Sequence, residues 1–235
     1  NGKRIRFIGF NFPARANMPD HKTAEALAAR LTTMGVNVVR VHAADAYVGE
    51  KGWSTDPEYS ILDYAGKTGR LNEKGMERLD YWLYPLKKHG IYRHIDLLVA
   101  RKFLESEGLD YPENLSMSKS SSHFNERLIE LQEQYARQYL THVNRYTGLS
   151  LAEDPAVMTI QICNEDSVFF DSKLGRKDPA VSAYKRELQQ RFNYFLLAKY
   201  GNKKNLKKAW TYRKHAEIVS DLGKDEDPAV GSVRC

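Results

Sequence analysis

The chain has 235 residues, of which 42% are hydrophobic and 28% are charged, a balance typical of a globular protein. No run approaches the roughly 18 apolar residues of a membrane-spanning helix, so we expect no membrane partner. Two cysteines, Cys163 and Cys235, are too few for a disulfide framework. The chain begins at Asn1 without a secretory signal pattern and enters a strand almost at once, so we expect a longer natural polypeptide and leave its localisation unknown.

The formal net charge is +6 and much of the excess is concentrated in the segment 199–214. Its basic residues are Lys199, Lys203, Lys204, Lys207, Lys208, Arg213 and Lys214. Such a run indicates either a nucleic-acid surface or a solvated helix face. No nucleic-acid-binding motif accompanies it, so we favour the solvated face and expect no nucleic-acid partner.

The first elements in chain order are a strand over residues 5–12, a helix over 24–34 and a strand over 36–42. Pro13 bounds the first strand, and Gly35 ends the helix, whose apolar residues recur at helical spacing. The second strand is β-branched and mostly apolar, which is typical of a parallel strand covered on both faces.

A long loop follows over residues 43–71, and its length indicates a functional or disordered segment. Asn72 is the expected N-cap of the next helix, which ends at Gly90 and leads into a strand over 91–99. The segment after this strand, 100–123, includes a serine-rich run at 118–122 that we expect to be flexible.

The third helix is expected over residues 125–144 and a fourth strand over 157–163. Asp178-Pro179 has the pattern of a helix start, with Asp as N-cap and Pro at the first position, and Gly201 ends that helix. A short helix over 206–212 and a polar, turn-rich tail complete the chain.

Strands and helices therefore alternate four times, and this order implies parallel strands joined by right-handed crossovers. Four units use nearly the whole chain, whereas an eightfold barrel takes about 250 residues at its usual size. We predict an α/β fold that forms the N-terminal half, about four βα units, of a (β/α)8 TIM barrel. We treat residues 1–235 as one partial barrel domain, with a small open α/β sheet as the alternative.

Asn164-Glu165 follows the apolar run of the fourth strand, at the end where α/β barrels carry their chemistry. A carboxyl group there suits cleavage of a sugar bond, because a positioned acid must protonate the leaving oxygen. Asn164 is placed to bind a sugar hydroxyl. The alternative, that the pair only caps the following turn, has equal weight on the pattern alone.

Arg40 and His42 are two residues apart on the second strand and therefore share a face. Beside Glu165, Arg40 would hold a carboxylate and His42 a sugar hydroxyl. Alternatively, Arg40 is buried against a structural acid and His42 is a satisfied core histidine. His94 and Asp96 on the third strand are assigned structural roles.

Aromatic residues in the second loop, Tyr47, Trp53 and Tyr59, are candidates for stacking on sugar rings, whereas Trp82 and Trp210 are expected to pack between helices. No zinc-binding HExxH or CxxC pattern occurs, so no metal is expected. The absence of GxGxxG, Walker A and GxSxG patterns argues against dehydrogenase, nucleotidase and α/β-hydrolase functions.

Four stretches make the chain similar to the catalytic barrel of clan A glycoside hydrolases, near family 5, the cellulase and mannanase-like family. They are residues 8–12, residues 35–42 with Asp45, residues 79–83 leading to 90–92, and residues 141–144 continuing through 154–165. Weaker similarity extends to residues 192–210, so that the likeness covers roughly residues 4–234.

The resemblance implies that Glu165 is the general acid/base, that Asn164 contacts the 2-hydroxyl, that Arg40 neighbours the nucleophile and that His42 lines the substrate cleft. It implies a carbohydrate substrate, a retaining two-carboxylate mechanism without a cofactor, and a secreted or periplasmic location. The family's nucleophile, a second glutamate, ends the seventh strand, so we expect it to be missing from this chain and this fragment to be inactive alone. Leu98 stands where many relatives carry a histidine.

Two functions from different classes remain open. The first is hydrolysis of O-glycosidic bonds in a poly- or oligosaccharide, and the second is carbohydrate binding by a non-catalytic half-barrel. The sequence favours the first because Glu165 follows an ordered set of strand motifs.

Overall fold

The computed structural model describes residues 4–50, 54–67, 69–109, 119–165, 167, 179–214 and 217–234. The chain divides into two units, the first made of Asn1–Ser122 with Glu126–Val168 and the second of His123–Asn125 with Phe169–Cys235. A single barrel domain over residues 1–235 stays a prediction.

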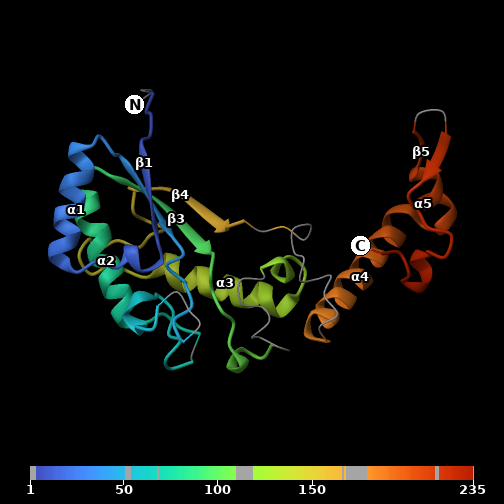
Figure 1. Ribbon diagram of the computed structural model, residues 1–235, viewed down its shortest axis with the longest axis horizontal. Coiled ribbons are helices and arrows are strands. Elements are labelled where there is room, and N and C mark those ends of the chain that lie inside the picture. Colours follow the sequence, from blue (N-terminus) through green and yellow to red (C-terminus); the bar gives the residue numbers. More distant parts are fainter. Residues whose placement is uncertain are drawn as a thin grey trace. The chain divides into compact units, whose positions relative to one another are not determined.

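Four parallel strands form the sheet of the first unit in sequence order: β1 (Gly9–Pro13), β2 (Val38–His42), β3 (Tyr92–Leu98) and β4 (Val157–Cys163). Helices α1 (His21–Thr33), α2 (Glu73–Lys88) and α3 (Glu126–Thr141) alternate with them, and Figure 1 shows α1 beside α2. This arrangement confirms the α/β prediction of about four βα units from one half of a (β/α)8 barrel.

The helices begin where the sequence provides caps. Asp20 accepts a hydrogen bond from the Thr23 backbone N–H at the start of α1, and Asn72 accepts one from Lys74 at the start of α2, as predicted. The buried stripe of α2 packs on the sheet and includes Trp82, which is fully buried and tilted against Phe12 at 5.2 Å between ring centres. Trp82 is therefore a packing residue, as expected.

The strand over residues 5–12 was predicted four residues too early at its start. The Ile8 backbone N–H donates to Asn37 Oδ1 at 2.8 Å, and Asn37 Nδ2 donates to the Arg6 carbonyl. Because the Asn37 side chain occupies these backbone groups, the regular pairing of β1 with β2 begins only at Gly9 and Val38.

The outer strands are more exposed than their apolar sequences predict. In β4, Met158 is 38% exposed and Ile162 is 69% exposed, and in β1 Phe10 is 44% exposed. Within the described residues β1 pairs only with β2 and β4 only with β3, so each has one open edge. Cys163 forms no disulfide within the part of the chain that the structure describes, and it is half-buried.

The second unit contains α4 (Pro179–Tyr200), α5 (Lys203–Ala209) and an antiparallel hairpin of β5 (Thr211–Lys214) and β6 (Glu217–Ser220). The short helix predicted over residues 206–212 exists but spans Lys203–Ala209, and the hairpin that follows it was not predicted. Asp178, the expected cap of α4, lies outside the described residues. Trp210 packs beside Phe192 at the edge of a small core, as expected. None of the helices that the structure describes is both long and apolar enough to cross a membrane.

A buried ion pair joins the starts of β3 and β4. Arg93 Nη2 donates to Asp154 Oδ2 at 2.5 Å, and Lys87 Nζ donates to Asp154 Oδ1 at 3.0 Å. Burial raises the pKa of Asp154, but the Ala156 backbone N–H and the Arg93 and Lys87 charges outweigh it, so the pKa lies below its ordinary value of 3.8.

We predict that Asp154→Asn flattens the acid limb of the stability curve. A carboxyl group whose pKa is lowered by folding stabilises the protein above its unfolded-state pKa, near 3.8, and this contribution is lost as the pH falls through the folded-state value. The variant should therefore be less stable than the wild type at pH 6 and lose less further stability below pH about 4. Urea unfolding across this range measures it. The exposed Asp225→Asn is the control; parallel curves for wild type and Asp154→Asn would contradict the prediction.

Candidate active site

The end of β4 presents Asn164 and Glu165 at the carboxyl edge of the sheet. The Asn164 backbone N–H donates to the Leu98 carbonyl at 2.9 Å, which extends the pairing with β3 by one residue. Asn164 is 8% exposed, whereas Glu165 is exposed and has a φ of 44°. A residue other than glycine rarely adopts this left-handed conformation.

Arg40 connects three strands on one face of the sheet. Its Nε donates to Asp96 Oδ2 at 2.8 Å, and its Nη2 donates to Gln161 Oε1 at 2.9 Å and to Asn164 Oδ1 at 2.6 Å. A guanidinium has only donors, so the Asn164 atom that faces it must be the oxygen. The amide Nδ2 of Asn164 is thereby left as the donor for another group.

Asp96 lies at the centre of this network with a fully buried side chain. Besides Arg40, it contacts His42, whose Nδ1 lies 2.5 Å from Oδ2. His94 Nε2 is 3.0 Å from Oδ1, without the alignment of a hydrogen bond. The pairing of Arg40 with a structural acid, one of the two interpretations from the sequence, is therefore present. It coexists with the contact from Arg40 to Asn164.

Lys119 also holds the end of β4. It is 9% exposed, and its ammonium group donates to the Asn164 carbonyl. The expectation that residues 118–122 are flexible is wrong for the described part: the short 3-10 helix Ser120–His123 begins there and Ser120, Ser121 and Ser122 are buried. Lys119 and Asn164 are 45 residues apart in the chain, so no local sequence pattern could have predicted that Lys119 holds the end of β4.

The structure brings together three of the predicted residues: Arg40 and His42 both contact Asp96, and Arg40 also binds Asn164. Glu165, the next residue after Asn164, is exposed. Sequence reasoning assigned Asp96 to structure and overlooked Gln161 and Lys119. Gln161 had one available signal: it is a polar residue inside an apolar strand, on the same face as Thr159. Among the described residues, no group of three or more His, Cys, Asp or Glu side chains is arranged to hold a metal ion.

The candidate stacking residues differ in their surroundings. Tyr59 has guanidinium groups on its ring, Arg15 at 5.4 Å and Arg78 at 5.3 Å from the ring centre. Tyr47 lines a cavity with Lys102 over its ring. Trp53 lies outside the described residues.

No protein-family model and no curated protein matches the chain. Among solved structures, the chain is similar to the endo-1,4-beta-mannanase from Rhizomucor miehei, with a TM-score of 0.52 and 16% identity over 85% of this chain and 55% of that one. Two further structures are less similar. The endo-beta-1,4-mannanase from Thermotoga petrophila has a TM-score of 0.47 and 21% identity over 84% of this chain and 41% of that one. The E301A mutant of a glycoside hydrolase family 5 mannosidase from Rhizomucor miehei has a TM-score of 0.46 and 16% identity over 81% of this chain and 48% of that one. The chain spans about half the length of these structures. The predicted resemblance to a glycoside hydrolase barrel is confirmed as a likeness of fold.

We predict that Asp96→Asn destabilises the first unit by about 2–4 kcal/mol, because it leaves the Arg40 guanidinium without its buried anion. The value is lower than for a fully buried pair since the Arg40 side chain is 31% exposed. The measurement is the free energy of unfolding in urea. Asp56→Asn is the matched control at an exposed helix N-cap, where Asn caps as well as Asp. Equal losses in both variants would show that the Asp96 network does not stabilise the site.

Proposed function

We propose that this chain is part of a retaining O-glycoside hydrolase in which Glu165 is the general acid/base. The observation that carries the proposal is the exposed Glu165 carboxyl at the end of β4, next to an Asn164 side chain that Arg40 holds in place. The confirmed likeness of fold to a mannanase supports it.

In the proposed reaction, a second carboxylate attacks the anomeric carbon while the bond to the leaving oxygen breaks. Glu165 gives its proton to that oxygen, and a covalent glycosyl-enzyme forms. Glu165 then takes a proton from water, and the water oxygen displaces the enzyme carboxylate and releases the sugar. By the resemblance, the nucleophile ends the seventh strand of the barrel, so residues 1–235 alone are proposed to be inactive.

The neighbouring side chains have roles that agree with their hydrogen bonds. Asn164 donates from Nδ2 to the sugar 2-hydroxyl, a contact that strengthens in the transition state. His42 is engaged by Asp96 through Nδ1, and its Nε2 serves a hydroxyl of the substrate. Arg40 places positive charge near the nucleophile and favours its ionised form.

A second candidate function is non-catalytic carbohydrate binding. One observation favours it. Retaining hydrolysis needs two carboxylates, but among the described residues that directly follow the four strands Glu165 is exposed, whereas Asp45 after β2 is fully buried. Turnover by the protein encoded by the complete reading frame separates the two functions.

We predict that Glu165→Gln in that protein lowers kcat/KM on β-mannan or β-glucan by about 10²–10⁴-fold, because general acid assistance contributes roughly this factor. Aryl glycosides with a strongly acidic phenol as leaving group should lose less in the bond-breaking step, since such a group needs no proton. Added azide should restore turnover of these substrates with formation of a glycosyl azide, since azide attacks without a general base. Steady-state kinetics and product analysis measure both effects.

Glu133→Gln, at an exposed position of α3, is the matched control and should retain activity. If Glu165→Gln lost polysaccharide and activated aryl glycoside turnover equally and azide restored neither, Glu165 would not be the acid/base. An inactive wild-type protein that still retained β-mannan or β-glucan on a column would favour the binding function.

A further inference from the structure

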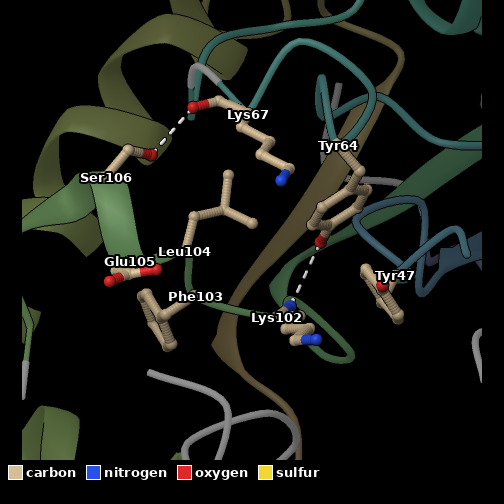
Figure 2. A pocket seen from close by; sticks show the side chains of 8 residues that line it. All are labelled: Tyr47, Tyr64, Lys67, Lys102, Phe103, Leu104, Glu105 and Ser106. Carbon is tan, nitrogen blue, oxygen red and sulfur yellow. Dashed lines mark hydrogen bonds between the residues drawn. The ribbon is translucent and has the colours of Figure 1, made fainter. Parts of the chain in front are cut away.

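A cavity of about 590 Å³ lies between the loops that follow β2 and β3 (Figure 2). This volume is within the usual range for small-molecule sites. Tyr47 comes five residues after the end of β2 and Lys102 four residues after the end of β3. Both loops leave the carboxyl edge of the sheet, the edge at which Glu165 also lies.

Hydrogen bonds fix the backbone around this cavity. The Tyr64 hydroxyl donates to the Asp45 carbonyl at 2.7 Å and accepts from the Lys102 N–H at 3.2 Å. The Asp45 carboxylate accepts from the Val99 and Ala100 N–H groups at 2.8 Å and 3.1 Å. The wall of the cavity is therefore largely preformed, so that binding a ligand would cost little free energy for ordering the backbone.

The cavity combines aromatic rings with two ammonium groups. Lys102 Nζ lies 4.4 Å from the centre of the Tyr47 ring, and Tyr47 meets Tyr64 edge to face at 5.1 Å. Phe103 adds a buried ring to the lining. Figure 2 shows the Lys67 side chain extending into the space between Leu104 and Tyr64.

Neither ammonium group is neutralised by a described residue. No hydrogen bond or ion pair joins the Lys67 or Lys102 Nζ to any side chain in the part of the chain that the structure describes, and the Lys102 ammonium group contacts the Tyr47 ring. The one acidic residue of the lining, Glu105, is exposed, and Figure 2 shows it on the far side of Leu104 and Phe103 from Tyr47. Among the described lining residues, the half of the cavity near Tyr47 therefore carries the two ammonium groups and no carboxylate.

We propose that this cavity binds a sugar unit that carries an anionic group, away from the bond that is cleaved. The proposal rests on the proposed glycoside hydrolase function and deepens it, because it assigns an acid-substituted carbohydrate as the substrate class. The aromatic wall takes the apolar face of the sugar ring, and Lys67 and Lys102 bind the anion. The anionic group is either the carboxylate of a uronic acid or the phosphate of a phosphorylated sugar.

The test is a titration of the full 235-residue chain, observed by NMR, with methyl β-glucuronide, its neutral match methyl β-glucoside, glucose 6-phosphate and inorganic phosphate. We expect the glucuronide or the sugar phosphate to bind about tenfold more tightly than the glucoside, with an affinity that falls as salt is raised. Whichever binds more tightly identifies the anion. Equal Kd values for glucuronide, sugar phosphate and glucoside would overturn the proposal, and so would inorganic phosphate binding as tightly as the charged sugars.

Lys67→Gln and Lys102→Gln should each raise the Kd of the charged sugar about three- to tenfold and leave that of the glucoside unchanged. Lys88→Gln is the matched control, because Lys88 also places its ammonium near a tyrosine ring, Tyr84 at 5.2 Å, but lines none of the described cavities. An equal effect of Lys88→Gln and Lys102→Gln would overturn the assignment.

Glu165→Gln should bind the charged sugar like the wild type. The binding result is therefore independent of turnover: failure of the cavity proposal leaves the role of Glu165 standing, and failure of the hydrolase proposal appears in the kinetics alone.

Discussion

The site depends on the buried carboxylate of Asp96. A charge out of contact with water is costly unless it is paired and hydrogen-bonded, and Arg40 and His42 provide that pairing from the neighbouring strand. Because Arg40 is held by Asp96, its remaining donors have a fixed direction and reach Asn164 on β4. The amide at the rim is thus positioned by a chain of contacts across three strands and does not depend on its own loop.

This chain of contacts requires the observed strand register. Arg40 pairs with His94 and Asp96 pairs with Gln161, so the alternating side chains of β2, β3 and β4 that form the network share one face. A slip of one residue in either pairing would turn Arg40 or Gln161 to the opposite face. The apolar residues that alternate with them, such as Val39, Val41 and Ile95, are fully buried, and a slip would expose them.

The sequence predicted the features that depend on residues close to one another in the chain. The bounds of β4, the cap at Asn72 and the shared face of Arg40 and His42 all follow from strand periodicity or from a single capping side chain. The pairing of Asp96 with Arg40 in particular did not follow, because the two residues are 56 positions apart and an acid in an apolar strand looks the same with or without a partner. The exposure of β4 was not predicted for a related reason. An apolar strand sequence shows that the strand is suited to burial, but it does not show whether another element packs over it.

The conformation of Glu165 shows how the network reaches the end of β4. A left-handed backbone at a residue other than glycine costs of order 1 kcal/mol or more, and it persists only where the surroundings fix it. Asn164 supplies this constraint through its N–H to Leu98, its side chain to Arg40 and its carbonyl to Lys119. The two contacts with charged donors are each worth about 1.5–3 kcal/mol, more than the strain. The backbone before Glu165 is therefore held firmly while its side chain is exposed, a combination that suits the proposed acid/base, which would give up a proton and take it back.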